Sequence, residues 1–378
     1  MASDRARIRR SVILNHPLGG GGAGLLRESG LIDSKSHMAR IWGKGLVGDD
    51  RRIVDRRAIP GQMTNLRYDE TMQGTVIGFG GTGNAKGRTE IVCYKNESHD
   101  FFPNRQWRGP PSQLTSLSLS PSKLLLMTAL DLNSPAYYLD LSDVTSEHYD
   151  KPDIETISLP TMNQSLQAST ANPFSSAVSF AIATSKGALV LNESEGDWAI
   201  KLSGLHTDSR GVTDVDWLSP NVIMKGCKDG GVLLWDIRTR GDSRESRFKH
   251  PSQINYARRI DETTIVVAGH ESHLCTYDLR FPSGEPYMKF PSYQNRMLGR
   301  LAAGFDVHGD LAAAVTDDSR IIIWDIKRGL KLMETERRVA ASTANTACVQ
   351  FMNGGQDKQV LRLMSAAGLM ITEFSWGR

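Results

Sequence analysis

Three short segments of the chain repeat an aromatic residue, an aspartate, an aliphatic residue and a basic residue in the same order. The first two are Trp235–Arg238 and Tyr277–Arg280, and the third, Trp324–Lys327, ends in lysine. An arginine carries a planar fork of five N–H donors that grips carboxylates and carbonyls, which the ammonium group of lysine cannot reproduce. Arg238 and Arg280 are therefore candidates for contact with another protein. The alternative is that both arginines are simply solvated.

The other positions of these segments support such a contact. Because Asp236 and Asp278 directly follow the aromatic residue, we expect each carboxylate to cap the turn that leaves a strand. With Arg238 and Arg280, they make up the predicted partner-binding residues. The predicted structural positions of the repeat, which pack between sheets or shape turns, are Asp229, Trp235, Tyr277, Trp324 and Asp325.

The sequence offers no pattern that is typical of a catalytic centre. It contains no G-x-S-x-G, no H-E-x-x-H and no paired Cys/His cluster. His270 and His273 are three residues apart, but a zinc site would need two further ligands and none is near in sequence. We therefore predict a polar turn at these histidines, no catalytic or metal-binding residues, and a protein that is not an enzyme.

The segment Gly78–Gly83 matches the G-x-G-x-x-G pattern of dinucleotide-binding loops. Such a loop needs a helix directly after it, so that the amide groups at the start of the helix meet the pyrophosphate. The following segment Thr89–Tyr94 is rich in β-branched and aliphatic residues and reads as a strand. We therefore predict a hairpin turn and no bound cofactor.

A longer repeat places the three segments in one architecture. In the clearest copy, Asp229 precedes Trp235 by six residues, with a tight turn and an apolar strand between them. Equivalent anchor positions recur 42 to 52 residues apart, at 94, 139, 191, 235, 277, 324 and 372. A period of about 40–45 residues with a Trp-Asp signature is typical of WD-repeat propellers. The sequence predicts an all-β fold, a seven-bladed WD-repeat β-propeller.

Such a ring must be closed between its first and last blades. One blade cannot bury both faces of its sheet, so the blades stack radially and leave only short edges. The last copy ends at Phe374–Trp376, which leaves little room for an outer strand. We predict that a segment near Met63–Tyr68, or an earlier one, supplies that strand.

Charge divides the chain into two parts. Residues 1–60 hold 12 Lys/Arg and 6 Asp/Glu, a net charge of +6, and residues 61–378 hold 33 and 36, a net charge of −3. We predict a basic, partly disordered N-terminal extension over 1–60, with a short helix within Leu31–Leu46, followed by the propeller over 61–378. The basic extension makes nucleic acid an alternative partner.

Composition narrows the class of protein. The 378 residues are 39% apolar and carry a net charge of +3, so disorder throughout is not expected. The longest apolar runs, about eight residues, are far shorter than the roughly 20 residues that span a bilayer, so we expect no membrane partner. We also expect the propeller to be a monomer. The four cysteines lie far apart in strand-like runs, which favours reduced thiols in the nucleus or cytoplasm.

At the Asp-x-Arg segments the chain resembles the WD-repeat substrate receptors of cullin-4 RING ubiquitin ligases, the adaptor-associated factors of that ligase. Trp235–Arg238 matches the Trp-Asp-x-Arg box of this family in full, and Tyr277–Arg280 matches it except for tyrosine. Gly226–Arg238, Asn255–Ala257 and Val267–Gly269 extend the resemblance. At the opening of a repeat, the Gly-His pair that is frequent in WD repeats is replaced by Gly204-Leu205-His206.

The resemblance implies a function that composition does not show. Members of this family dock on the ligase adaptor, the large damage-specific DNA-binding protein subunit, and present a substrate whose identity the sequence does not reveal. Many also insert an arm that precedes the propeller, and Arg5–Leu14 or Ile32–Leu46 would fill that place here. The alternative function is a general WD-repeat scaffold in an RNA- or chromatin-associated complex.

Overall fold

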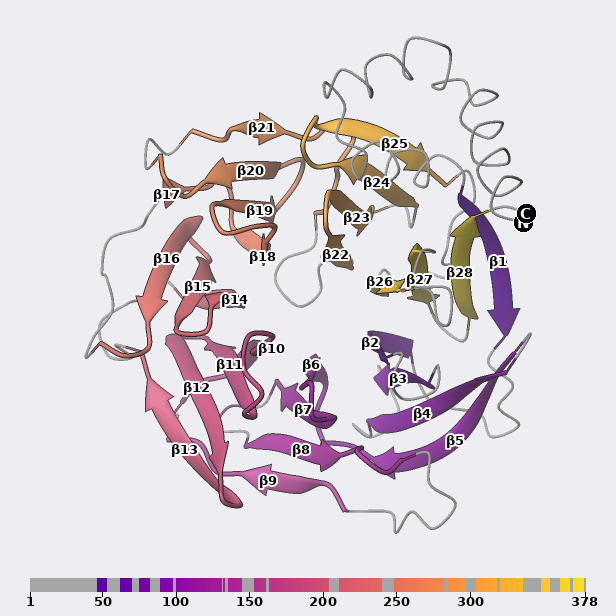
Figure 1. Ribbon diagram of the computed structural model, residues 1–378, viewed down its shortest axis with the longest axis vertical. Coiled ribbons are helices and arrows are strands. Elements are labelled where there is room, and N and C mark those ends of the chain that lie inside the picture. Colours follow the sequence, from indigo (N-terminus) through magenta and orange to yellow (C-terminus); the bar gives the residue numbers. More distant parts are fainter. Residues whose placement is uncertain are drawn as a thin grey trace, which may run out of the picture.

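The computed structural model consists of strands, turns and connecting segments without a helix in the residues that it describes. These are residues 46–52, 62–69, 75–81, 89–97, 100–130, 132, 135–144, 153–160, 163–203, 211–239, 248–281, 285–296, 304–317, 320–335, 348–353, 361–367 and 370–376. They form four-stranded sheets, seven in the described part of the chain, and Figure 1 shows these sheets arranged as a ring. The predicted all-β fold of repeated antiparallel sheets is confirmed.

Each sheet has strands at four positions, counted outward from the centre of the ring. The central strands are β2 (Gln62–Asp69), β6 (Leu114–Leu119), β10 (Leu166–Ala171), β14 (Val212–Ser219), β18 (Ile254–Arg259), β22 (Phe305–His308) and β26 (Cys348–Asn353). The second strands are β3 (Thr75–Gly81), β7 (Leu124–Ala129), β11 (Ser179–Thr184), β15 (Val222–Cys227), β19 (Thr264–Gly269), β23 (Leu311–Val315) and β27 (Leu361–Ala367). Each sheet takes the name of its central strand.

The two outer positions complete each sheet. The third strands are β4 (Glu90–Glu97), β8 (Ala136–Asp140), β12 (Gly187–Ser194), β16 (Gly231–Asp236), β20 (Leu274–Asp278), β24 (Ile321–Asp325) and β28 (Met370–Trp376). The outermost strands are β5 (Asp100–Arg108), β9 (Glu155–Ile157), β13 (Asp197–Leu202), β17 (Phe248–Lys249), β21 (Met288–Lys289), β25 (Leu330–Glu334) and β1 (Leu46–Arg52). Every anchor position of the sequence repeat lies in a third strand.

The ring is closed by a strand from near the start of the described chain. Each central strand contacts the next, and β26 contacts β2, so the described sheets complete a circle. In the β26 sheet, β1 pairs antiparallel with β28, from Leu46 opposite Trp376 to Arg52 opposite Met370. The closing strand is thus the earlier of the two segments expected, because residues 63–68 lie in the central strand β2 instead.

The closing strand β1 precedes the domain boundary that the sequence predicts at residue 60. The expected boundary at residue 60 would leave Leu46–Arg52 outside the ring, whereas its backbone pairing places it in the β26 sheet. The sequence of β1 is mostly polar and charged, as in a segment exposed to solvent. Its place in the sheet is therefore set by backbone pairing with β28. The helix expected within Leu31–Leu46 lies outside the described residues, apart from Leu46 itself.

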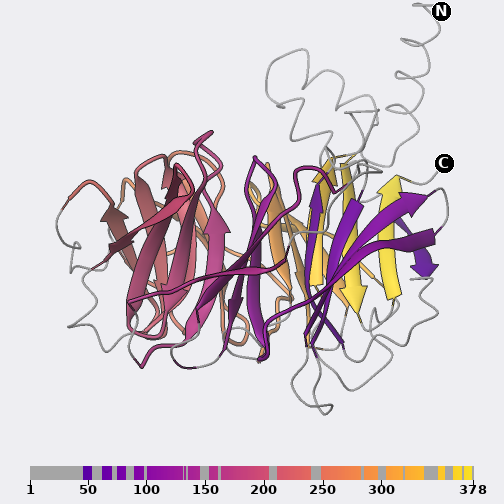
Figure 2. The ribbon, with the colours of Figure 1, turned by 90° about the horizontal axis from the view of Figure 1, so that it is seen from below.

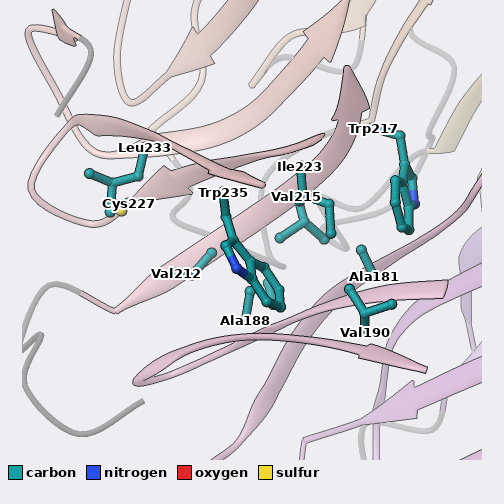
Figure 3. Close-up of a cluster of buried hydrophobic side chains, with 11 residues drawn as sticks. Ala181, Ala188, Val190, Val212, Val215, Trp217, Ile223, Cys227, Leu233 and Trp235 are labelled. Carbon is teal, nitrogen blue, oxygen red and sulfur yellow. The ribbon is translucent and has the colours of Figure 1, made fainter. Parts of the chain in front are cut away.

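Large aromatic side chains from one sheet fill the space beside small side chains of the next. Trp217 of β14 and Trp235 of β16 are buried in a cluster that includes Ala181 and Ala188 of the β10 sheet. Figure 3 shows Ala188 beside the ring of Trp235. Because protein interiors are close-packed, a pairing of large with small residues fixes how closely two sheets approach. Burying such a side chain stabilises the fold by about 1.5–3 kcal/mol.

Carboxylates join the β14 and β18 sheets at the centre of the ring. The Oδ2 atom of Asp214 accepts a hydrogen bond from the backbone N–H of Ala257 at 2.8 Å, and that of Asp216 accepts one from Arg259 at 2.9 Å. Arg258 also forms an ion pair with Asp214 through Nη1. The inner edge of β18 would otherwise present backbone donors without strand partners, so these side chains hold the two sheets together.

Neighbouring sheets elsewhere in the ring use similar contacts. Asp306 of β22 accepts a hydrogen bond from the backbone N–H of Phe351 in β26 at 2.7 Å. The hydroxyls of Ser116 in β6 and Ser169 in β10 lie 2.6 Å apart and are hydrogen-bonded. Polar side chains of the central strands thus connect neighbouring sheets at the centre of the ring.

We expect replacement of Gly230 by alanine to destabilise the fold by more than about 1 kcal/mol. Gly230 has a φ of +85° in the turn before β16, a conformation that L-residues rarely adopt. An added Cβ would also lie 2.3 Å from the carbonyl oxygen of His250. Urea unfolding checks this value, with Gly196→Ala as the control because its positive φ lies in open space. Equal stability losses in the two variants would contradict the steric part of the argument.

Three smaller predictions can be compared with the structure. Gly78–Gly81 end strand β3, which pairs antiparallel with β4, so the glycine-rich segment belongs to a β-hairpin. Cys93, Cys227 and Cys275 are buried and Cys348 is half-buried, and none of these four described cysteines forms a disulfide bond. Among the described residues, no helix has the length and apolar character needed to cross a bilayer.

Candidate functional site

Asp236 holds the guanidinium group of Arg238 through two nearly parallel hydrogen bonds. Nη2 donates to Oδ2 at 2.6 Å, and Nε donates to Oδ1 at 3.0 Å. The backbone N–H of Arg238 donates to the same Oδ1 at 3.0 Å, so the carboxylate also caps the turn after β16. The arginine side chain is 67% exposed. Its Nη1 has no acceptor within the described part of the chain, so this edge of the fork faces outward.

Asp278 and Arg280 repeat this arrangement at the end of β20. Nη2 of Arg280 donates to Oδ2 of Asp278 at 2.6 Å, and Nε donates to Oδ1 at 2.9 Å. The backbone N–H of Arg280 donates to Oδ1 at 2.9 Å, and the side chain is 65% exposed. The two segments therefore present arginine forks that are fixed in the same way before any partner binds.

The third copy of the segment has a different geometry. Asp325 is buried, and its Oδ1 accepts a hydrogen bond from the backbone N–H of Arg328 at 3.2 Å. Lys327 instead pairs with Asp310, with 3.0 Å between Nζ and Oδ2. Burial raises the pKa of Asp325, whereas the two arginine-paired aspartates have lowered pKa values. Among these three segments, the first two therefore present an outward-facing guanidinium group, and Trp324–Lys327 does not.

Both forks lie on one face of the ring. The sheets repeat the same antiparallel strand order, so the ends of all third strands point to the same face. Figure 2 shows strands running between the two faces of the disc. The β14 and β18 sheets that carry the forks are neighbours, because β14 contacts β18 directly. This face, where the third strands end, is called the fork face below.

The electrostatic surroundings of the two forks differ. Lys201 of β13 acts on Asp236 and, after the larger effect of the Arg238 hydrogen bonds, helps to lower its pKa. Asp261, in the turn between β18 and β19, acts instead on Arg280 and helps to raise its pKa, after the effects of Asp278. The first fork therefore has an additional positive neighbour and the second an additional negative one.

We expect Asp236 to remain ionised far below neutral pH. Hydrogen bonds from the side chain and then the backbone of Arg238 lower its pKa to about 2. Because the folded-state pKa is depressed, the stabilisation by the pair is present above the unfolded pKa of about 3.9 and is lost as the pH falls through about 2. Carbon-13 NMR titration of the aspartate carboxyls measures this midpoint, with the resonance assigned through Asp236→Asn.

The control for this titration is Arg238→Ala. Removing the guanidinium takes away the largest cause of the shift but leaves the backbone N–H in place. The midpoint of Asp236 should then rise toward the ordinary value of about 3.9. A wild-type midpoint near that ordinary value, or one that the substitution does not change, would contradict the geometry of the pair.

The repeat residues that were expected to be structural lie within the sheets and their turns. The aromatic side chains of Trp235, Tyr277 and Trp324 are buried. The phenol of Tyr277 is hydrogen-bonded to Nδ1 of His250 at 2.9 Å. Asp229 accepts a hydrogen bond from the backbone N–H of Gly231 at 2.9 Å and so shapes the turn into β16. These residues hold the third strands in place and do not reach the fork face.

The two histidines that could suggest a metal lie in the turn between β19 and β20. Nδ1 of His273 lies 3.1 Å from the carbonyl oxygen of His270, and Nε2 of His270 lies 3.0 Å from that of Arg296. No group of three or more candidate metal ligands occurs among the described residues. The arrangement is that of a hydrogen-bonded turn.

The comparisons with known proteins bear on the fold and on the repeat. No known family profile matches the chain. WD repeat-containing protein 21 of Schizosaccharomyces pombe is 26% identical over 157 residues, which cover 40% of this chain and 36% of that protein. The chain thus spans about a third of the length of this curated relative.

A solved structure extends the likeness to most of the chain. The crystal structure of the β-propeller domain of Cps50 (Swd1) from Myceliophteria thermophila matches with a TM-score of 0.61 and 15% identity. The match covers 87% of this chain and 99% of that domain. The fold is that of a WD-repeat β-propeller. Each sheet of the propeller is a blade, and the two forks belong to consecutive blades.

Proposed function

We propose that this WD-repeat propeller is a non-catalytic scaffold that serves as a substrate receptor of a cullin-4 RING ubiquitin ligase. It docks on the ligase adaptor, the large damage-specific DNA-binding protein subunit, through Asp236–Arg238 and Asp278–Arg280. The substrate binds elsewhere on the chain, and ubiquitin transfer takes place in other subunits. WD-repeat propellers are generally non-catalytic protein-binding scaffolds, which supports the proposed role as a scaffold.

One observation carries the docking proposal more than any other. Two arginine forks, each fixed by its own aspartate, leave consecutive blades on the same face. A fork that is already ordered loses less side-chain entropy when it binds than a free arginine does. The outward Nη1 edge suits a carboxylate or a backbone carbonyl of a partner, because guanidinium groups recognise planar oxygen acceptors.

The choice of the ligase adaptor as the partner of this surface is based on the resemblance to the adaptor-associated factors. The paired boxes in successive blades are what that family uses to contact the adaptor. The third segment departs from the pattern because Asp325 is buried and Lys327 pairs with Asp310. The proposed docking surface is therefore limited to the β14 and β18 blades.

Affinity purification with mass spectrometry tests the proposal in cells. The wild-type chain is compared with the Arg238→Ala/Arg280→Ala variant. We expect the adaptor and cullin-4 to be recovered with the wild type and to be strongly depleted with the double variant, while substrates bound elsewhere remain. Equal recovery of the adaptor with both chains, or its absence from both, would refute the proposal.

The alternative is a general scaffold of an RNA- or chromatin-associated complex. It is favoured by the net charge of +6 over residues 1–60, because basic segments bind phosphate backbones through counterion release. The same purification separates the two functions when it is repeated after nuclease treatment. If the alternative holds, the co-purified partners should be lost after nuclease treatment, and their recovery should not depend on Arg238 and Arg280.

A further inference from the structure

Four exposed lysines lie at turns and strand ends on the face opposite the forks. Second and outermost strands run antiparallel to third strands, so they end on this face, which is called the far face below. Lys186 lies between β11 and β12, Lys228 lies between β15 and β16, and Lys249 and Lys289 end β17 and β21. These four residues, called the lysine arc below, come from the consecutive β10, β14 and β18 blades (Figure 1).

The first two lysines of the arc meet across the boundary between two blades. A Cβ added at Gly211 would lie 3.1 Å from Cδ of Lys228 and 3.2 Å from the carbonyl oxygen of Ser185. Ser185 directly precedes Lys186. The aliphatic stem of Lys228, in the β14 blade, therefore runs beside the turn of the β10 blade that carries Lys186.

Backbone pairing joins Lys228 to the third lysine within the β14 blade. Lys249 lies opposite Gly231, which begins the strand after the Lys228 turn. The N–H of His250 also donates to the carbonyl of Gly230 at 2.7 Å. The turn that carries Lys228 and the end of β17 are thus adjacent parts of one sheet edge on the far face.

The histidine turn of the β18 blade connects this edge to the fourth lysine. The ring centres of His250 and His273 lie 6.0 Å apart, across the boundary between the β14 and β18 blades. The N–H of Phe290 donates to the carbonyl of Leu274 at 3.0 Å, directly after that turn. Lys289 precedes Phe290, so it continues the arc on the other side of the histidines.

The positive charge of the arc is not neutralised within the described part of the chain. None of the four ammonium groups forms an ion pair or a hydrogen bond there. On the fork face, by contrast, Lys327 pairs with Asp310. The described fork-face turns of the same three blades also carry exposed carboxylates, such as those of Glu195, Asp261 and Glu285. The far face of these blades is therefore the surface that attracts an anionic ligand.

The composition of the far face favours a nucleic acid over an acidic protein. Protein interfaces usually have an apolar core, but Leu202, at 38%, is the single exposed large apolar side chain on the described far face of these blades. Interfaces with nucleic acids are more polar and much more positively charged. Lysine is a point charge on a flexible stem, so the arc can follow a row of phosphates without a fixed geometry.

We propose that the lysine arc binds the phosphate backbone of a nucleic acid without sequence preference. The four ammonium groups replace condensed counterions along the backbone, and the bases are not read. The site does not depend on the docking proposal, and it stays open when a partner covers the fork face. It would act together with the net charge of +6 over residues 1–60.

The salt dependence of binding tests the arc quantitatively. Fluorescence anisotropy measures the affinity of the purified full chain for a labelled RNA strand and for a labelled DNA duplex over a salt series. Each phosphate contact contributes about 0.7–0.9 to the slope of log K against log salt. The variant Lys186→Gln/Lys228→Gln/Lys249→Gln/Lys289→Gln should therefore reduce that slope by about 3–4, and each single variant by about 1, on every sequence alike.

A second quadruple variant separates position from net charge. It removes four cations at or near the fork-face ends of their strands: Lys123→Gln/Lys327→Gln/Arg328→Gln/Lys331→Gln. Its net charge equals that of the arc variant, but its slope should stay close to that of wild type. Equal changes in the two variants would show that net charge alone attracts the nucleic acid, which would overturn the arc. Thermal melting of both variants verifies that the propeller is intact.

The remaining outcomes are equally distinct. A reduced slope in the arc variant alone supports the proposal. Wild-type slopes in the arc variant, or no nucleic-acid binding by wild type, would refute it. Binding of polyglutamate that requires the arc, without binding of either nucleic acid, would assign the far face to an acidic protein instead. Arg238→Ala/Arg280→Ala should bind nucleic acid as wild type does, so failure of the arc leaves the docking proposal intact, and the reverse also holds.

Discussion

Replacing Asp214 by alanine should lower the free energy of unfolding by about 3–5 kcal/mol, which is typical of the loss of one partner of a buried ion pair. Asp214 is buried, and its Oδ2 accepts hydrogen bonds both from Arg258 and from the backbone N–H of Ala257. Without the carboxylate, the guanidinium lacks its nearest counter-charge, and a backbone donor at the edge of β18 loses its acceptor. Urea unfolding followed by circular dichroism measures the loss.

Two controls separate this effect from a general loss of charge. Asp197→Ala removes an exposed aspartate from β13, and surface changes of this kind usually stay within about 0.5 kcal/mol. A double-mutant cycle with Arg258→Ala measures the coupling, and we expect the double variant to cost less than the sum of the single variants. A loss below about 1 kcal/mol for Asp214→Ala, or additive single losses, would show that this contact does not join the blades.

The repeat made much of this fold predictable from sequence. Trp235, Tyr277 and Trp324 are large, buried and regularly spaced, and every weaker anchor also lies in a third strand. This pattern is local, because a tight turn and an apolar strand occupy neighbouring positions in the chain. Blade packing then follows from the repeat, since each sheet needs a neighbour on both of its faces.

Contacts between distant segments were not predictable in the same way. Leu46–Arg52 has no alternation of apolar and polar residues, and pairing with β28 alone makes it a strand. The carboxylates of Asp214 and Asp216 meet β18 more than 40 positions further along the chain. The sequence of β14 alone does not indicate which backbone donors its polar side chains satisfy. The burial of Lys225 in β15 likewise had no signal in the sequence.

At the candidate site, sequence indicated the residues but not their geometry. The spacing of Asp236 and Arg238 suggested a turn cap and a free fork, whereas the aspartate caps the turn and also binds one edge of the fork. Phe281 follows the second box directly, and its ring centre lies 5.7 Å from the guanidinium carbon of Arg280, a contact that the spacing of the box does not predict.

Removing both forks should produce the largest change in binding. Truncation of a charged side chain in a partner contact typically weakens affinity by roughly 30-fold or more, so Arg238→Ala/Arg280→Ala should reduce adaptor binding beyond what either single variant does. Arg238→Lys should restore only part of the affinity, because lysine keeps the charge and lacks the fork. Neither arginine is buried, so the melting temperature of the variants should stay close to that of wild type.

Arg296→Ala is the matched control for these variants. Its side chain is 81% exposed and lies beside an aspartate, with 3.7 Å between Nε of Arg296 and Oδ2 of Asp317. Arg296 follows the outermost strand β21, which runs antiparallel to the third strand β20. Since the forks follow third strands, Arg296 lies on the face opposite the fork face. We expect this variant to bind the adaptor as wild type does, which would show that position on the fork face, and not loss of any exposed arginine, determines binding.

Isothermal titration calorimetry of the purified full chain with the purified adaptor is the most direct measurement. We expect one-to-one binding by wild type and by Arg296→Ala, and an interaction that is about 30-fold weaker, or undetectable, for Arg238→Ala/Arg280→Ala. Wild-type affinity in the double variant, with all chains folded, would contradict the claim that the two forks form the docking surface.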